Sequence, residues 1–243
     1  MCIRDSFTVG QVTLNAVQDT VSNITDINKI DSTEVSMAAA TVTVTDPASL
    51  SDANAINLMT EGKVTLNSVA DTYANIQEVK KISDAQVDMG AAAVRVTNNI
   101  TKSEVDDLLT DTNGKITVDF ITEDKSDLST INDNTNVILS TANITVEDNV
   151  SRAEADIIDA YSNTSGIVTL TSITDTLENI EAINQNSVIS LASAQITVLD
   201  PVSLSQANAL NLMTEGKVTL NSVADTYSNI QSIKSIEDAL VDM

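Results

Sequence analysis

The side chains that could do chemistry in this chain are almost all carboxylates and hydroxyls. The sequence contains 35 Asp and Glu but no His, and His is both the commonest general base and the commonest metal ligand of proteins. Its absence excludes Ser-His-Asp triads, Cys-His pairs and most zinc sites. Catalysis would therefore have to use carboxylate, Lys, Ser, Thr or Tyr side chains.

Three groups of acidic residues are dense enough to suggest a hard cation such as Ca²⁺, which takes carboxylate oxygens in irregular geometry. They are Asp106 with Asp107, Glu147 with Asp148, and Glu154 with Asp156 and Asp159. None matches the Asp-x-Asp-x-Asp-Gly loop, and no Gly-Gly-x-Gly-x-Asp repeat occurs. We therefore favour solvated acidic faces and predict no metal, cofactor or catalytic residue, with calcium kept as the open alternative.

Glycoside hydrolysis by two carboxylates is a reaction that this composition leaves open. Such a site needs a cleft and usually an aromatic platform, yet aromatic residues make up only 2% of the chain. We expect a protein without catalytic activity, and a carboxylate-based hydrolase is a distant alternative.

The net charge restricts the partners of the protein. With 12 Lys and Arg the charge is −23, which repels nucleic acid and anionic membrane surfaces. No run of about 18 apolar residues is present, so no membrane insertion is expected. Hydrophobic residues nevertheless make up 42% of the chain, so an aliphatic core is expected.

An internal repeat is the strongest pattern in the sequence. Residues 53–73 recur at 207–227 with one change, Ile56 to Leu210. A glycine followed by an apolar-Thr-apolar run marks period starts near residues 10, 62, 114, 166 and 216. The period is therefore about 52 residues, and we interpret residues 10–243 as one continuous repeat domain.

Each period divides into two strand-helix units. The first strand follows the glycine, as at 63–66, and apolar residues spaced by three and four then predict a helix, as over 69–82. A second strand, as at 42–46, precedes a second helix. The second helices are predicted over 50–59, 102–109, 152–161 and 204–213. A short third strand, as at 35–38, is expected between the first helix and the second strand.

Polar residues, prolines and glycines predict the ends of these helices. Asp19, Asp71, Asp175 and Asp225 are expected to cap the first helices, and Asp46, Asn98, Asp148 and Asp200 the second ones. Pro47 and Pro201 are expected at first helical positions. Gly62, Gly114, Gly166 and Gly216 are expected to end helices with positive φ.

One strand-helix unit is too small to bury its own apolar face, so neighbouring units must stack. Strands that are joined by helices favour parallel pairing with right-handed crossovers. The sequence therefore predicts an α/β repeat solenoid with a parallel β-sheet and short helices. An all-β solenoid is the alternative, and the helical spacing of the apolar residues argues against it.

Three repeated polar residue types could form ladders or platforms. Thr recurs along the strands at Thr13, Thr65, Thr117, Thr169 and Thr219, and again at Thr43, Thr145 and Thr197. Regular Thr ranks can bind ice, although Thr is also an ordinary exposed strand residue. Asn23, Asn75, Asn179 and Asn229 could bond between units or face solvent. Tyr73, Tyr161 and Tyr227 are more simply apolar-stripe residues than sugar platforms.

The two ends of the sequence differ from the repeat. Residues 1–6, Met-Cys-Ile-Arg-Asp-Ser, resemble a translated sequencing-adapter artefact, so residues 1–9 are set apart as artefact or tail. The only cysteine lies there, so neither a disulfide nor a reactive thiol is expected. Residues 240–243 match 86–89 in the middle of a period. We therefore expect a fragment of a longer repeat protein.

The segment Ala70-Asp71-Thr72-Tyr73-Ala74-Asn75-Ile76, with copies at 174–180 and 224–230, resembles the Asp-Thr-x-x-Asn-aliphatic repeats of very large bacterial surface and adhesin-like proteins. The resemblance covers nearly the whole chain after residue 10, although the central copy has Asp127-Leu128 in place of Asn-Ile. It implies an extracellular or cell-surface structural and adhesive role. Partners would be neighbouring repeats of the same chain, surface polymers or other cells. The alternative is a solenoid scaffold that binds carbohydrate, an ion or an ice surface.

Overall fold

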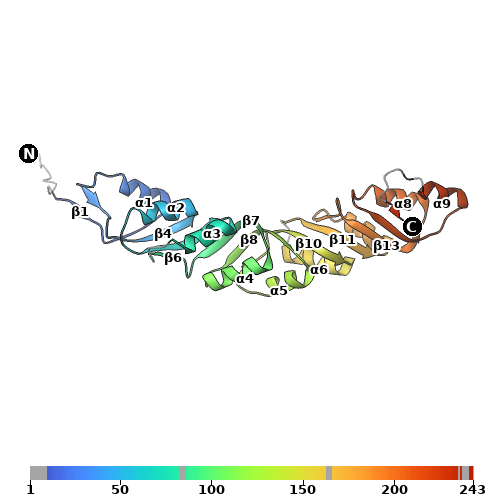
Figure 1. Ribbon diagram of the computed structural model, residues 1–243, viewed down its shortest axis with the longest axis horizontal. Helices are drawn as coiled ribbons and strands as arrows, with labels where there is room; N and C mark the ends of the chain where they lie inside the picture. Colours follow the sequence, from blue (N-terminus) through green and yellow to red (C-terminus); the bar gives the residue numbers. More distant parts are fainter. Residues whose placement is uncertain (1–9, 83–85, 163–165, 235, 237–240, 243) are drawn as a thin grey trace, which may run out of the picture. The chain divides into compact units, whose positions relative to one another are not determined.

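The computed structural model describes residues 10–82, 86–162, 166–234, 236 and 241–242. Over these residues, parallel strands and short helices alternate along the chain (Figure 1). The predicted α/β class with a large parallel sheet is confirmed, and the described residues do not form an all-β structure. Two compact bodies can be distinguished, Met1–Asn98 with Asp107–Thr117, and Asn99–Asp106 with Val118–Met243. The expected artefact or tail at 1–9 lies outside the described residues.

In the first body, the long strands pair in parallel in chain order. They are β2 (Ala16–Asp19), β4 (Thr41–Ala48), β5 (Val64–Asp71) and β7 (Ala93–Ile100). Helices α1 (Val21–Asn28), α2 (Leu50–Asn57) and α3 (Tyr73–Lys80) follow β2, β4 and β5 and lie side by side (Figure 1). The two-residue strands β3 (Val35–Ser36) and β6 (Val87–Asp88) confirm the predicted short third strand, and β6 pairs with β5. The two-residue strand β1 (Val12–Thr13) lies in the predicted first strand and pairs with β3.

The second body repeats this arrangement. Its long strands, paired in parallel in this order, are β8 (Ile116–Glu123), β10 (Asn143–Val150), β11 (Val168–Asp175), β13 (Gln195–Val202) and β14 (Val218–Val223). Its helices are α5 (Lys125–Asn132), α6 (Arg152–Ser162), α7 (Leu177–Asn184), α8 (Leu204–Asn211) and α9 (Tyr227–Lys234). The short strands are β9 (Val137–Ile138), β12 (Ile189–Ser190) and β15 (Val241–Asp242). Helix α4 (Lys102–Asp111) contributes residues to both bodies.

The core of each body is an aliphatic layer between strands and helices. In β4 the buried residues Val42 and Val44 alternate with the more exposed Thr41, Thr43 and Thr45, which is the pattern of a sheet buried on one face. The helices contribute residues such as Ile56, which is completely buried. Burying such a side chain contributes about 1.5–3 kcal/mol, so the repeated apolar stripe stabilises every unit.

The two prolines lie in strands, which corrects the prediction that they begin helices. Pro47 belongs to β4 and Pro201 to β13, and each lies at a shift in the pairing register with the next strand. The shift inserts one extra residue into the strand and interrupts the hydrogen-bond ladder. A residue without an N–H group is tolerated at such a position. The strand therefore extends to Ala48, past the predicted end at residue 46, and Pro47 lies before the helix, which starts at Leu50 as its predicted range indicated.

Candidate functional site: contacts between neighbouring strand-helix units

A carboxylate at the end of one strand binds the helix of the preceding strand-helix unit. Oδ2 of Asp71, the last residue of β5, accepts a hydrogen bond of 2.9 Å from the amide of Leu50, the first residue of α2. Oδ1 of Asp71 accepts hydrogen bonds from the Thr72 amide and from Asn75 Nδ2, both at 2.8 Å. The first four amides of a helix have no partner within the helix, and negative charge is favourable there. One side chain thus stabilises the starts of two helices.

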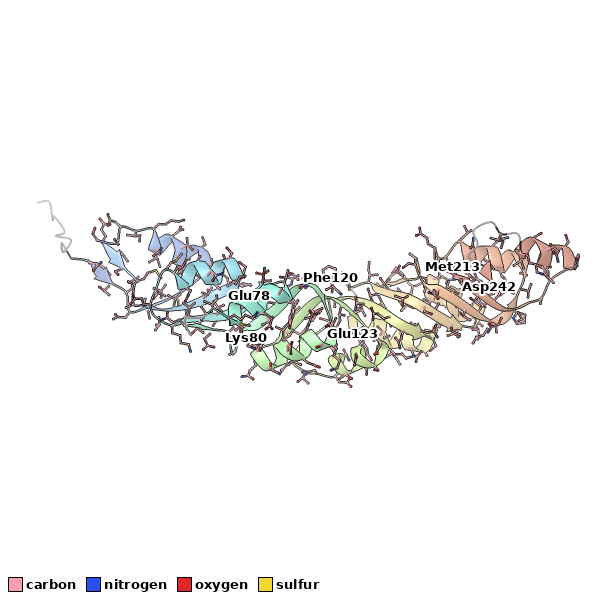
Figure 2. All side chains as sticks on the ribbon, in the orientation of Figure 1. Glu78, Lys80, Phe120, Glu123, Met213 and Asp242 are labelled. Carbon is pink, nitrogen blue, oxygen red and sulfur yellow. The ribbon has the colours of Figure 1, made fainter. Side chains whose placement is uncertain are left out.

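The same contact recurs at eight helices. Its donor and acceptor pairs are Val21 and Asp46, Leu50 and Asp71, Tyr73 and Asn98, Lys102 and Glu123, Lys125 and Asp148, Arg152 and Asp175, Leu177 and Asp200, and Leu204 and Asp225. We call these eight acceptors the acceptor ladder. All except Asn98 are carboxylates, and Figure 2 labels one of them, Glu123 at the end of β8.

The acceptor ladder corrects the predicted helix caps. Asp71 was expected to cap α3, but the N-cap of α3 is Thr72, whose hydroxyl accepts from the Asn75 amide. Asp46 was expected to cap α2, but the N-cap of α2 is Ser49, and Asp46 binds the start of α1 instead. The residue type was predicted correctly, whereas the helix that each residue serves depends on which units are neighbours in space.

The repeated asparagines hold the carboxylates in place. Asn75 Nδ2 donates to Asp71 at 2.8 Å, and Asn179 Nδ2 donates to Asp175 at 2.7 Å. The same bond, across four residues, joins Asn23 to Asp19 and Asn229 to Asp225. The bond that all four asparagines share therefore lies within their own unit. Asn179 Oδ1 also accepts a hydrogen bond of 3.3 Å from Arg152 Nη1 of the neighbouring unit, so a contact between units is formed at this asparagine.

Hydrogen bonding lowers the pKa of three of the ladder carboxylates, Asp71, Asp175 and Asp225. Partial burial is the largest influence on Asp71 and acts to raise its pKa, but the Leu50 amide, Asn75 and the Thr72 amide together hold that pKa below its ordinary value. The pKa of Asp175 is lowered in the same way. Burial is the largest single influence and acts to raise it, but the hydrogen bonds from Asn179 and from the amides of Arg152 and Thr176 together outweigh burial. The pKa of Asp225 is lowered chiefly by the amide of Leu204.

A second contact between units uses a threonine, an alanine and a glycine. The hydroxyl of Thr60 donates to the carbonyl of Ala40 at 2.6 Å and accepts from the amide of Gly62 at 2.9 Å. Thr112 makes the same two bonds with Ala92 and Gly114, and Thr214 with Ala194 and Gly216. Sequence reasoning missed this contact, although Thr two residues before the glycine was a visible signal.

The period-marking glycines do not have the positive φ that was predicted. Helix α2 ends at Asn57 with a right-handed C-cap at Leu58, and Gly62 follows in the loop with φ outside the left-handed region. A Cβ atom at Gly62 would overlap the carbonyl oxygen of Ala40. Gly114, Gly166 and Gly216 face Ala92, Ala142 and Ala194 in the same way. Close approach of two backbones, rather than a turn, requires glycine here.

The first acidic group, Asp106 and Asp107, is divided between two contacts. Asp106 forms an ion pair with Lys102 on its own helix. Asp107 accepts a hydrogen bond of 2.9 Å from the Tyr73 hydroxyl. The two carboxylates therefore bind different side chains, Lys102 and Tyr73.

Most of the other acidic candidates also have basic or amide partners, and two of them share Lys125. Asp148 accepts from the amide of Lys125, and Glu154 lies 2.8 Å from Lys125 Nζ. Glu147 is exposed. Asp156 lies 3.6 Å from Arg152 Nε, and Asp159 accepts from Asn186 Nδ2 at 3.2 Å. Over the described part of the chain, no three acidic, His or Cys residues are grouped closely enough to hold a metal ion.

The threonine ranks on the sheet are short. In the second body Thr174, Thr197 and Thr219 are aligned across three strands, and the next aligned residue is Asp242, which Figure 2 labels. A second rank consists of Thr122, Thr145 and Thr169, followed by Ser190. In the first body Thr43 is aligned with Thr65, between Gln18 and Asp88. An extended surface of regularly spaced hydroxyls is not formed by these residues.

Two surface hollows of the described residues are open to solvent and carry no convergent set of reactive groups. One of about 320 Å³ lies between α2 and α3 and is lined by Leu50, Asn54, Glu78, Lys81 and Ile82. Among the helices of the described residues, none is both long enough and apolar enough to cross a membrane.

Comparison with known proteins gives no further guide. No protein-family model, curated protein or solved structure matches this chain significantly. Function has to be argued from the residues and their contacts.

Proposed function

We propose that this chain is a non-catalytic structural or adhesive repeat module of a secreted or cell-surface bacterial protein, folded as a solenoid with two strand-helix units per period. The observation that carries the proposal is the acceptor ladder, in which the same bond recurs at eight helices. Active sites concentrate unusual polar residues in one place. Here the polar residues are distributed evenly and bind backbone amides.

The motif that resembles bacterial surface repeats supports the same role. Its three polar residues have distinct tasks in the fold: Asp71 is the acceptor, Thr72 is the N-cap, and Asn75 positions the carboxylate. A repeat whose characteristic residues hold neighbouring units together suits a spacer or stalk. Its partners would be neighbouring repeats, surface polymers or other cells.

Antibodies against this chain, applied to intact cells that carry its gene, test the proposed location. We expect surface labelling that disappears when the cells are treated with an external protease. Permeabilised cells provide the control for total protein. Labelling that appears only after permeabilisation, and survives external protease, would contradict a secreted or cell-surface role.

A binding scaffold is the second candidate, and the aligned residues Thr174, Thr197 and Thr219 favour it. Three hydroxyls in register on one sheet could contact an ice surface or a regular polysaccharide. Thermal hysteresis and binding to insoluble glycans, measured for the parent chain and for Thr197→Lys, test this function. Activity that is lost in the variant would support it, whereas no activity in the parent chain would exclude both ligands.

A further inference from the structure

Helix α9 repeats helix α3, and it carries the same three hydrogen-bond donors. Residues 207–227 repeat 53–73 with one change, so both helices follow nearly identical strands. The matching donors are Tyr73 and Tyr227, Gln77 and Gln231, and Lys80 and Lys234. The two helices therefore present the same chemistry to whatever lies beside them.

In the first body, these donors bind two carboxylates of α4. The Tyr73 hydroxyl donates to Asp107 at 2.9 Å, and Gln77 Nε2 donates to Asp111 at 2.9 Å. Lys80, labelled in Figure 2, forms an ion pair with the same Asp111, whose side chain is only 3% exposed. Two carboxylates four residues apart lie on one face of a helix, so α3 recognises that spacing.

The equivalent surface of α9 is exposed. Tyr227 is 79% exposed, and Gln231 and Lys234 also belong to the exposed residues. The apolar residues beneath show the same difference, because Val69 and Ile76 are fully buried whereas their equivalents Val223 and Ile230 are half-buried. The C-terminal strand-helix unit thus leaves accessible the surface that β5 and α3 bury.

The strand beside α9 also has an accessible edge. Residues 68–71 of β5 pair in parallel with residues 93–96 of β7. In β14 the corresponding segment begins at Ser222, and among the described residues the strand beyond it, β15, pairs only with Val218 and Thr219. An unpaired strand edge is a template for another strand.

We propose that the edge formed by β14 and α9 is a docking surface for a further strand-helix unit of the β7–α4 type. The strand of that unit pairs with residues 222–225, and its helix presents two carboxylates four residues apart to Tyr227, Gln231 and Lys234. The interface between α3 and α4 is its template, and the Lys234 charge complements the carboxylates. The inference concerns this edge alone and does not depend on a cell-surface role.

A lengthened chain tests the proposal directly. Residues 90–113 are added after Met243, because Met243 and Met89 occupy the same position in the repeat. Amide hydrogen exchange of residues 222–225 is then measured with the extension, with a scrambled extension of equal length, and without either. We expect the native extension to slow exchange at these residues by about tenfold or more, and the scrambled one to leave it unchanged.

Two further variants separate recognition from a failure of the extension to fold. Replacing the added copies of Asp107 and Asp111 by Asn should remove part of the protection, and Lys234→Ala with the native extension should remove a similar part. Equal exchange with native and scrambled extensions would overturn the proposal. Protection that instead rises with the concentration of the unextended chain would assign the edge to a second copy, which would also overturn it.

Discussion

At the scale of single residues, Gly62 shows how closely neighbouring segments approach. Its amide binds Thr60, and its Cα faces the Ala40 carbonyl without room for a Cβ atom. We expect Gly62→Ala to destabilise the fold by about 1–3 kcal/mol, which is the usual cost of forcing extra atoms into a packed site. Urea unfolding measures this loss.

Gly10→Ala is the matched control for that substitution. No atom lies within 4 Å of the position that its Cβ would take, so its stability should change by no more than about 0.5 kcal/mol. Equal losses in the two variants would mean that the Ala40 carbonyl does not determine the need for glycine at Gly62.

Also at the residue scale, Asp71 stabilises more than its own helix. We expect Asp71→Ala to lower the free energy of unfolding by about 1–2 kcal/mol, because the amide of Leu50 loses its acceptor and α2 loses a favourable charge. Asp26→Ala is the control, since Asp26 is exposed and forms an ion pair with Lys29, the C-cap residue of its own helix. Its loss should stay below about 0.5 kcal/mol, and a comparable loss in both variants would contradict the role of Asp71.

At the scale of secondary-structure elements, the alternation of strands and helices was predictable, whereas their ends and partners were not. The helices starting at Leu50 and Lys102 follow from apolar spacing, which depends only on local sequence. Pro47 was misplaced because an extra residue in β4 shifts the register, and register is a property of two strands together. The partner of Asp46 likewise depends on which helix lies beside it in space.

The candidate site was predictable to a similar extent. Asp71 and its equivalents were identified as acceptors for helix amides, because an acidic side chain just before an apolar helical stripe can accept hydrogen bonds from the first helical amides in any fold. For Asn75 the sequence left open a bond between units or a solvent-facing position, whereas its side-chain amide binds Asp71 within its own unit. A period of about 52 residues reveals which residues are equivalent, but it does not reveal which equivalent residues touch.

At the scale of the whole molecule, the lowered pKa values make stability depend on pH. Asp71, Asp175 and Asp225 have folded pKa values below the ordinary unfolded value of about 3.9. Their contribution is therefore present above that unfolded value and is lost as the pH falls through the folded values. We expect the melting temperature to fall below about pH 4. It is measured from pH 7 to pH 2 at fixed ionic strength.

The control for this acid dependence is a variant in which Asp71, Asp175 and Asp225 are all replaced by Asn. It should be less stable than the parent chain at pH 7 and should lose less stability on acidification, because the three substituted groups no longer titrate. A variant whose melting temperature falls with pH as steeply as that of the parent chain would place the acid sensitivity elsewhere.

The net charge of −23 also makes stability depend on cations. Since the ladder carboxylates are engaged with backbone amides, we expect calcium, magnesium and sodium chloride to raise the melting temperature equally at matched ionic strength, through screening alone. Melting curves with each salt, and with a chelator, measure this. A rise of many degrees with calcium alone would identify a specific calcium site and reverse our interpretation of the acidic groups.

Amide hydrogen exchange at the first helical residues tests most directly whether neighbouring units are joined by the acceptor ladder. Leu50, Leu177 and Leu204 donate their amides to Asp71, Asp200 and Asp225, whereas the amides that follow them at Ser51, Glu178 and Ser205 begin the same helices without such an acceptor. We predict slow exchange at the three leucines and fast exchange at the three residues after them. Equally fast exchange at both sets of amides would contradict the account.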